Sequence, residues 1–280
     1  MSDFDGKVAL VTGGGRGLGQ GTAIELASRG ARVAVADRKP EIAEETVELC
    51  NKAGTGAKAF VFDQAKAESV EACVAEVADH YGQIDLLFAN AGTGTFAPIA
   101  DMKKADWDFV IQVNLNGTFY VCQEVVKRMI KRGEGGKIVL TASSGSRVIA
   151  DQLGAYCASK AGVEMLMKHM AAELGNYRIN VNAILPGVVE TGMTMPMLAE
   201  EKWRNMLVRE TPVGRWGKPQ DVAKLVAFLL SEDASYINGE GIMIDGGSTL
   251  HGFPRWYGLD YTKKNECDWD EVFNHYPYKT

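Results

Sequence analysis

Short runs of apolar, largely β-branched residues alternate with helix-length segments along most of the chain. The apolar runs predict seven strands, at Lys7–Val11, Arg32–Ala36, Ala57–Phe62, Ile84–Ala89, Lys137–Thr141, Arg178–Ile184 and Gly241–Ile244. Helices are predicted between them, one reaching about Arg29 and the others at Glu41–Ala53, Ser69–Tyr81, Asn116–Lys131, Ala155–Leu174 and Gln220–Leu230. Strands that are apolar on both faces and alternate with helices are typical of a parallel sheet covered on both sides. We therefore expect an α/β fold with a doubly wound, seven-stranded parallel sheet.

No internal repeat or linker divides the 280 residues, so residues 1–248 are expected to form a single domain. Residues 249–280 follow as an extension rich in aromatic side chains: Phe253, Trp256, Tyr257, Tyr261, Trp269, Phe273, Tyr276 and Tyr278. Disordered segments are poor in aromatic residues. We expect the extension to be ordered and packed on the core or on a neighbouring subunit, either forming part of the substrate site or covering an apolar patch.

Charge and cysteine content narrow the class of protein. The chain has 36 acidic and 30 basic residues and a net charge of −6, which argues against a nucleic-acid partner. Its five cysteines are scattered and form no Cys-x-x-Cys pair, as in proteins of a reducing compartment. The sequence has no signal-peptide pattern and no apolar run near the roughly 18 residues of a membrane span. We expect a cytoplasmic protein, and the four histidines show no spacing that predicts a metal site.

A glycine-rich turn lies between the first predicted strand and the first helix, with the sequence Thr12-Gly13-Gly14-Gly15-Arg16-Gly17-Leu18-Gly19. Backbone N–H groups at a helix N-terminus bind a pyrophosphate, and glycines let the phosphates approach the backbone closely. At the first junction of a βαβ unit, such a turn predicts a dinucleotide site. The residues expected to form it are Gly13, Arg16, Gly17, Leu18 and Gly19.

Asp37 follows the second predicted strand. A carboxylate at this position accepts hydrogen bonds from the adenosine ribose hydroxyls and repels a 2′-phosphate. Arg16 and Arg38 are nearby in the sequence, and arginines are how such sites accept NADP. A charge pair at about 4 Å is worth about 4 kcal/mol at an effective dielectric of 20, before desolvation and screening. Asp37 can therefore exclude the phosphate if the arginines point away, and we expect NAD(H) rather than NADP(H).

Tyr156 and Lys160 are four residues apart in a predicted helix, so their side chains share one face. A free tyrosine has a pKa near ~10 and is a poor base at neutral pH. A neighbouring ammonium and a cationic nicotinamide both favour the phenolate. The pair predicts proton transfer by the phenol.

Together these features resemble the short-chain dehydrogenase/reductase superfamily, in its form of roughly 250 residues, from the N-terminus to Gly247. The matching residues, in order, are Thr12-Gly13-x-x-x-Gly17-x-Gly19, Asn90-Ala91-Gly92, Asn114, Ser143, Tyr156-x-x-x-Lys160 and Pro186-Gly187-x-x-x-Thr191. The resemblance implies a Rossmann-like fold. It also implies an oxidoreductase that transfers a hydride between NAD(H) and a secondary alcohol or ketone.

The resemblance assigns roles to four catalytic residues. Tyr156 would give or take the hydroxyl proton, and Ser143 would hydrogen-bond the substrate oxygen. Lys160 would hold the nicotinamide ribose and lower the pKa of Tyr156. Asn114 would position a water that relays protons outward. Ser144 competes with Ser143 for its role, and the spacing to the tyrosine disfavours it.

The resemblance also implies cofactor contacts at Asp63, Asn90, Gly92, Tyr156, Lys160, Pro186, Val189 and Thr191. Asp63 would contact the adenine, and Val189 and Thr191 would bind the carboxamide. The methionine-rich segment from Met193 to Met206 resembles the substrate loop of the superfamily. Its thioethers suggest an adaptable apolar wall for a hydrophobic substrate, and ordinary packing of a helical lid explains them equally well.

Two other functions are considered. A 3-oxoacyl-carrier-protein-type reductase would use the basic cluster Lys127–Arg132 as a docking patch, although Asp37 argues against it and the cluster also fits a solvated helix end. A non-catalytic nucleotide-sensing scaffold is disfavoured because all four catalytic residues are present.

The resemblance also suggests a homotetramer or homodimer, in which helices Asn116–Lys131 and Ala155–Leu174 pair with their counterparts. Their interior residues are more apolar than one covered face requires: Val121, Val125, Met129, Val163 and Leu166.

Overall fold

The computed structural model describes residues 3–54 and 56–250. They contain a seven-stranded parallel sheet in the order β3-β2-β1-β4-β5-β6-β7. The strands are β1 (Val8–Thr12), β2 (Arg32–Asp37), β3 (Ala57–Val61), β4 (Leu86–Ala89), β5 (Gly136–Thr141), β6 (Ile179–Pro186) and β7 (Gly241–Ile244). The strand order reverses between β1 and β4, which confirms the predicted doubly wound, Rossmann-like fold.

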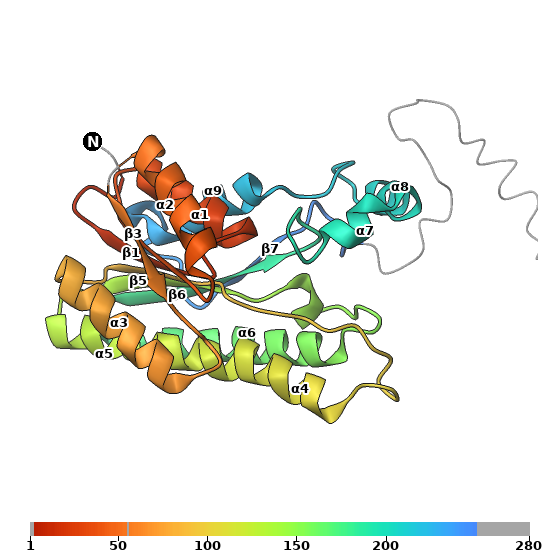
Figure 1. Cartoon of the computed structure of the whole chain (residues 1–280), viewed down its shortest axis with the longest axis horizontal. Helices are drawn as coiled ribbons and strands as arrows, with labels where there is room; N and C mark the ends of the chain where they lie inside the picture. Colours follow the sequence, from red (N-terminus) through yellow and green to blue (C-terminus); the bar gives the residue numbers. More distant parts are fainter. Residues whose placement is uncertain (1–2, 55, 251–280) are drawn as a thin grey trace, which may run out of the picture.

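Helices cover both faces of the sheet (Figure 1). One face is covered by α1 (Gly17–Ser28), α2 (Pro40–Ala53) and α9 (Pro219–Leu230), and the other by α3 (Ala67–Tyr81), α5 (Gly117–Arg132) and α6 (Gly154–Leu174). Each layer has its own buried apolar core. β1 is buried along its whole length because side chains on both faces of a parallel sheet are covered.

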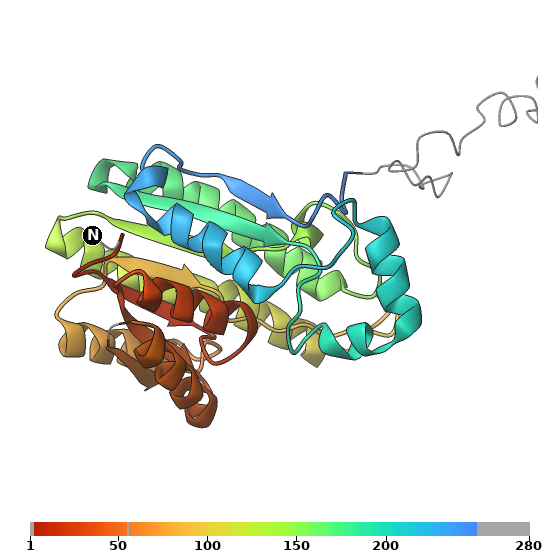
Figure 2. The same cartoon turned by 90° about the horizontal axis from the view of Figure 1, so that it is seen from above.

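Shorter helices surround the carboxyl ends of the strands. They are α4 (Lys104–Ile111), the π-helix Gln112–Asn116, the 3-10 turn Ser144–Ser146, α7 (Met195–Ala199) and α8 (Glu201–Glu210). Figure 2 shows α7 and α8 beyond the ends of β6 and β7, with β7 at one edge of the sheet. No helix was predicted at 104–111, and a helical lid was one of two interpretations of the segment from Met193 to Met206. α4 buries only Val110 and α8 buries no residue, so both lack the buried stripe on which helix prediction depends.

Six of the seven predicted strands differ from the observed ones by one or two residues at one or both ends. Arg178, expected to open a strand, has a φ of 58°, and β6 begins one residue later. β4 begins at Leu86 rather than Ile84, and just before it the Asp85 side chain contacts the backbone of β1. A left-handed residue and a side-chain contact of this kind leave no hydrophobic signal in the sequence.

The interior residues of α5 and α6 need no second subunit to cover them. Val121, Val125, Met129 and Val163 are fully buried or nearly so within one chain, and Leu166 packs against the same core. The prediction that these residues are too apolar to be covered within one chain was wrong. Both helices lie on a sheet that is itself apolar, so their buried stripes are accounted for by that contact.

The basic residues at the end of α5 are ion-paired. The amine of Lys127 lies 2.6 Å from a Glu124 oxygen, and a guanidinium nitrogen of Arg128 lies 2.9 Å from the other. These contacts hold the pKa of Glu124 below its ordinary value, chiefly through the hydrogen bond from Lys127. Arg132 pairs with Asp85 at 2.9 Å. The positive charges of Lys127, Arg128 and Arg132 are therefore balanced in large part by Glu124 on the same helix and by Asp85 at the amino end of the sheet.

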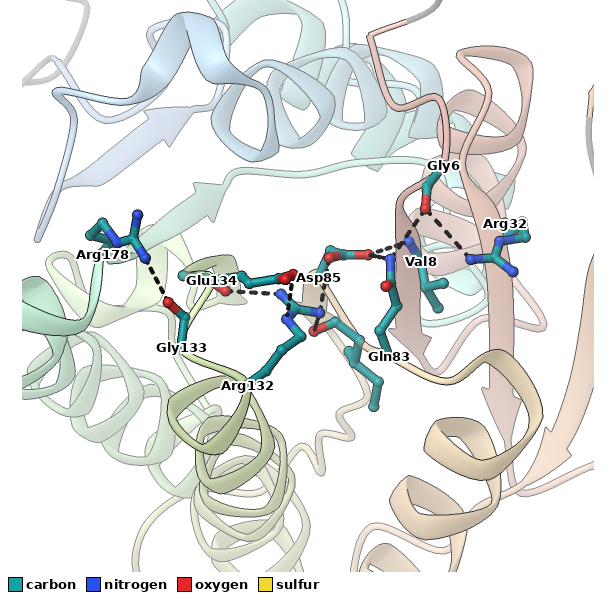
Figure 3. A network of polar contacts seen from close by, with 11 residues as sticks. Gly6, Val8, Arg32, Gln83, Asp85, Arg132, Gly133, Glu134 and Arg178 are labelled. Atoms are coloured by element: carbon teal, nitrogen blue, oxygen red, sulfur yellow. Dashed lines mark hydrogen bonds and ion pairs between the residues drawn. The ribbon is translucent and has the colours of Figure 1, made fainter.

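Asp85 joins three elements at the amino ends of the strands (Figure 3). It is 3% exposed, so its carboxylate depends on protein partners. One oxygen accepts hydrogen bonds from the backbone N–H of Val8 and the amide of Gln83, both at 2.7 Å, and the other contacts Arg132. The network ties β1, β4 and α5 together at the end of the sheet opposite the glycine-rich turn.

Replacing Asp85 with asparagine is expected to lower the free energy of unfolding by about 3 kcal/mol, because it breaks the buried ion pair with Arg132 and leaves that guanidinium only the more exposed Glu134 as an acidic partner among the described residues. Denaturant unfolding measures the change. Glu76→Gln is the control, since Glu76 and Lys58 form an exposed pair at 3.6 Å and its loss should cost less than about 1 kcal/mol. Equal stabilities of the two variants would contradict the assigned importance of Asp85.

Candidate active site

Two adjoining cavities lie at the carboxyl ends of the strands, where the strand order reverses. Their volumes are about 310 and 210 Å³, and they share Gly13, Asp37, Ala91 and Gly92. The larger one is lined by most of the predicted cofactor residues: Gly13, Arg16, Gly17, Leu18, Asp37, Asn90, Gly92, Tyr156, Lys160, Pro186, Val189 and Thr191. Asp63 lines the smaller cavity. The structure thus brings together residues from six separate loops.

The glycine-rich turn forms one wall of the larger cavity. Gly13 and Gly17 have φ values of 61° and 56°, which side chains other than glycine rarely adopt. A Cβ on Gly13 would lie 2.9 Å from the Cα of Ala91, so the two loops touch backbone to backbone. Arg16, the N-cap of α1, makes no side-chain capping bond, which leaves the first N–H groups of the helix for a ligand. The turn therefore fits a pyrophosphate.

Gly19 has a different role from the one predicted. It lines neither cavity, and a Cβ there would overlap the carbonyl oxygen of Gly13. Gly19 is buried and permits close packing of α1 on the turn. The glycine motif is a single pattern in the sequence, and only the fold separates its contact positions from its packing position.

Asp37 borders both cavities. Its carboxylate accepts hydrogen bonds at 3.1 Å from the backbone N–H groups of Gly15 and Lys39. Arg16 lines the larger cavity and Arg38 the smaller one, so each lies on its own side of the carboxylate. The Asp37 carboxylate therefore lies where the two cavities meet, with Arg16 in the lining of one cavity and Arg38 in the lining of the other.

Lys160 is held by the end of β5. Its amine donates a 2.6 Å hydrogen bond to the carbonyl oxygen of Thr141 and lies 5.8 Å from the centre of the Tyr156 ring. Burial lowers the pKa of Lys160 to about 8. Asn90, on the neighbouring loop, is fixed by hydrogen bonds to Thr12 at 3.0 and 3.1 Å. The hydrogen bond to Thr141 holds the amine of Lys160 in the cavity that this residue lines.

Tyr156 is partly buried in the cavity wall, and desolvation raises the pKa of its phenol above the ordinary value. The hydrogen bond from Ser143 acts in the opposite direction, and the nearby Cys157 adds to the rise. The expected lowering by Lys160 is not found in the chain alone, because desolvation dominates and the amine is directed at Thr141. Ser143 itself is 8% exposed and its hydroxyl accepts a 3.0 Å hydrogen bond from the N–H of Gly145, and the choice of Ser143 over Ser144 stays a prediction.

Asn114 lies in the π-helix and is completely buried. Its side-chain oxygen accepts from the N–H of Thr93 at 2.8 Å, and its amide donates to the Thr93 carbonyl and to the Ser159 hydroxyl at 2.8 and 3.0 Å. All polar atoms of the side chain are therefore occupied. The residue fixes the loop after β4 to α6, and its role in holding a proton-relay water stays a prediction.

The substrate side of the cavity is apolar. A Cβ on Gly94 would lie 3.4 Å from the Tyr156 ring and 3.7 Å from the sulfur of Met193, so the two side chains meet at this glycine. Met195, Trp203 and Met206 are partly exposed on α7 and α8. The structure thus brings Met193 to the tyrosine and leaves the rest of the methionine-rich segment on the rim.

Four residues to which the sequence analysis assigned no role support the site: Thr12, Thr141, Ser159 and Thr194. Thr12 opens the quoted glycine motif, and its position was the signal that could have identified it. The carbonyl of Thr141 acts through the backbone, which no side-chain pattern reveals. Ser159 and Thr194 hold their partners through contacts that arise only in the folded chain.

Residues 3–54 and 56–250 contain neither a metal-ligand cluster nor a membrane-spanning helix. No cluster of three or more metal-ligating side chains occurs in these ranges. None of the helices within them has the length and apolar character needed to span a bilayer. The four cysteines in the described part are free thiols.

Comparison with known proteins places this site in a family. A family model described as enoyl-(acyl carrier protein) reductase matches residues 13–249. D-Threitol dehydrogenase from Mycolicibacterium smegmatis is 41% identical over 251 residues, covering 88% of this chain and 94% of that one.

Two solved structures are also similar. Carveol dehydrogenase from Mycobacterium avium in complex with NAD has a TM-score of 0.86 and 29% identity, covering 90% of this chain and 100% of that one. Gluconate 5-dehydrogenase from Burkholderia cenocepacia in complex with NADP and tartrate has a TM-score of 0.85 and 35% identity, covering 89% and 98%. The chain belongs to the short-chain dehydrogenase/reductase superfamily and is an oxidoreductase of that group.

Tyr156→Phe is expected to lower kcat by about 10²- to 10⁴-fold, because it removes the hydroxyl to which we assign the proton transfer. The Kd of the nicotinamide cofactor, measured by fluorescence titration, should stay within about twofold, since the ring that lines the cavity remains. Tyr177→Phe, on the exposed turn after α6, is the control and should be silent. A Tyr156→Phe enzyme with more than a few per cent of normal activity would exclude the phenol as the proton-transfer group.

Proposed function

We propose that the chain is an NAD(H)-dependent dehydrogenase or reductase for secondary alcohols and their ketones. The observation that carries the proposal is that Tyr156 and Lys160, whose amine lies 5.8 Å from the centre of the phenol ring, line one cavity together with the glycine-rich turn. The nicotinamide, when bound, supplies or accepts the hydride. The residues of the chain handle the proton and hold the reactants.

Tyr156 donates the proton to the carbonyl oxygen during reduction and accepts it from the hydroxyl during oxidation. Ser143 donates a hydrogen bond to the same oxygen and stabilises the charge that develops there. Lys160 binds the ribose beside the nicotinamide through its amine, which the Thr141 carbonyl orients. The apolar contact of Gly94 with Met193 excludes water from the reacting carbon.

The cofactor is proposed to be NAD(H), because Asp37 borders both cavities at the position expected for the adenosine ribose. The NAD complex of carveol dehydrogenase supports this assignment, whereas the NADP complex of gluconate 5-dehydrogenase shows that related chains bind the phosphorylated form. Arg16 and Arg38, on either side of the carboxylate, are the residues that would hold a 2′-phosphate once the repulsion is removed.

Asp37→Ala is therefore expected to reduce the ratio of kcat/KM for NAD⁺ to that for NADP⁺ by at least about tenfold, which corresponds to 1.4 kcal/mol. Steady-state kinetics with both cofactors measures the ratio. Asp63→Asn is the control, because Asp63 lines the adenine-side cavity and not the junction. Comparable kcat/KM values for the two cofactors in the unmodified protein would refute the assignment to NAD(H).

The substrate is proposed to be hydrophobic at the end that faces Met193. The carveol dehydrogenase neighbour favours such a substrate, while the threitol dehydrogenase relative favours a polyol. A panel of cyclic, aromatic and aliphatic secondary alcohols, assayed beside tetritols and sugar acids for NAD⁺ reduction, separates these classes. Turnover of the polar set alone would refute the hydrophobic assignment and leave the proton chemistry intact.

A carrier-protein reductase is the second candidate, favoured by the description of the matching family model. The ion pairs of Lys127, Arg128 and Arg132 leave little free positive charge for an acidic carrier. Reduction of an acyl-carrier substrate with NADPH, faster than of any free ketone, would establish this alternative. A folded protein that binds cofactor and turns over none of these substrates would indicate the nucleotide-sensing scaffold.

We also propose a cytoplasmic homotetramer. Phe119 on α5 and Met165 on α6 are 42% and 65% exposed, which leaves apolar surface on the outer side of both helices. β7, at the sheet edge, has only one neighbouring strand. The free thiols support a reducing compartment.

Residues 251–280 of the predicted aromatic extension lie outside the described residues. Packing of the extension on the core or on a partner subunit remains a proposal. Deleting residues 251–280 is expected to raise the KM for the alcohol by roughly tenfold, about 1.4 kcal/mol of binding, while light scattering still reports a tetramer. Unchanged KM and kcat in an assembled enzyme would remove the extension from the substrate site. A monomer would instead place it at the subunit contact.

A further inference from the structure

Glu164 is a nearly buried carboxylate for which the proposed reaction has no use. It lies on α6 four residues after Lys160 and eight after Tyr156, so the three side chains follow one face of the helix. The residue is only 6% exposed. A carboxylate at this depth depends on protein partners for its charge.

The partners of Glu164 come from the loop that carries the catalytic serine. One carboxylate oxygen accepts a 2.6 Å hydrogen bond from the hydroxyl of Ser146. The other accepts from Nε and Nη2 of Arg147 at 3.0 and 2.6 Å. Lys168, one turn further along α6, adds an ion pair at 3.4 Å. The first three contacts join α6 to residues that directly follow Ser143.

The same contacts extend to the backbone on both sides. The hydroxyl of Ser146 also lies 2.7 Å from the carbonyl oxygen of Ser143, so a single hydrogen is shared between that carbonyl and Glu164. Nη2 of Arg147 donates to the carbonyl of Gly241 in β7 at 3.1 Å. A Cβ on Gly241 would lie 2.8 Å from that nitrogen, so the ion pair has little room to shift.

Charge keeps this arrangement in place. Burial alone would raise the pKa of Glu164, but hydrogen bonds from Arg147 and Ser146, together with the charges of Arg147 and Lys168, hold it below its ordinary value. The carboxylate therefore stays ionised at neutral pH. Loss of one partner of such a pair leaves an uncompensated charge beside the serine loop.

We propose that Glu164 is a positioning residue which, through Ser146 and Arg147, fixes the serine loop against the helix of the catalytic tyrosine. The inference rests on the proposed function, in which Ser143 and Tyr156 share the substrate oxygen. Small displacements of a loop change its distance from the helix on which it packs. The contacts of Glu164 therefore set the distance between the hydroxyls of Ser143 and Tyr156. Glu164 itself touches neither substrate nor cofactor.

The expected signature is a pH effect as well as a rate effect. The titratable groups that the structure places against Tyr156 are Lys160 and Cys157, and those facing Glu164 are Arg147 and Lys168. A substitution of Glu164 leaves these four residues themselves in the chain. Alcohol oxidation requires the phenolate, and the Ser143 hydrogen bond lowers the pKa of the phenol. A loosened loop therefore moves the rising limb of kcat to higher pH.

The test compares Glu164→Gln with Glu173→Gln, which alters an exposed carboxylate on the same helix whose ion pair within the described residues is with His169. At neutral pH, kcat of Glu164→Gln should fall roughly ten- to hundredfold, the cost of an ångström-scale misplacement, with the cofactor Kd unchanged. Its rising limb should move to higher pH. The Glu173→Gln enzyme should match the unmodified protein in all three measurements.

A double variant, Glu164→Met with Arg147→Met, separates positioning from stability. Replacing both charges by apolar side chains restores or raises the melting temperature. The reduced kcat and the shifted pH limb should nevertheless persist, because the serine loop still lacks its anchor. Full recovery of kcat together with stability would overturn the proposal, as would a normal pH profile in a folded Glu164→Gln enzyme.

Amide hydrogen exchange of residues 145–147 supplies a measurement that needs no substrate. Exchange in Glu164→Gln should be at least roughly tenfold faster than in the unmodified protein, since the loop opens locally without its anchor. If the unmodified enzyme turns over no alcohol, the proposed function fails while exchange still reports on the anchor. If the unmodified enzyme is active and exchange is unchanged in the variant, only the role of Glu164 is wrong.

Discussion

The site depends on one constraint of the parallel sheet, the reversal of strand order between β1 and β4. The helix that follows β1 packs on one face and the helices that follow β4 pack on the other (Figure 1), and the crevice formed by the two cavities lies at these strand ends. Hydrogen bonds from Asn90 to Thr12, at 3.0 and 3.1 Å, join the two loops that border this crevice. Without them the glycine-rich turn and the loop of Gly92 would not share a cavity wall.

Placing Lys160 and Tyr156 in this crevice lowers the stability of the folded chain. Lys160 has a pKa lowered to about 8 by burial, and burial raises the pKa of the Tyr156 phenol. Both shifts mean that a charged form is disfavoured in the folded chain, and neither residue is replaceable by a simple core side chain if it is to handle protons. The backbone carbonyl of Thr141 and the hydroxyl of Ser143 compensate in part, because each offers a hydrogen bond to one of the two groups.

The two ends of the sheet solve different problems with buried polar groups. At the amino ends, Asp85 satisfies its carboxylate with backbone, amide and guanidinium donors and so holds β1, β4 and α5 together (Figure 3). At the carboxyl ends, Asn114 and Glu164 anchor loops onto the helix of the catalytic tyrosine. The first network joins elements at the amino ends of the sheet, whereas the second set is what we propose positions the catalytic atoms.

The sequence alone determined the sheet, its parallel winding and the residues that gather at its carboxyl edge. This is because apolar periodicity and glycine spacing are local signals, and strand ends in such a sheet must meet at one edge. Tertiary structure decided the rest. It separated Gly19, which packs, from Gly13 and Gly17, which border the cavity. It assigned the apolar stripe of α5 to the core of a single chain and placed Glu164 under the serine loop. These roles depend on contacts between residues far apart in the chain, and a side chain carries no mark in the sequence of the partner it will meet.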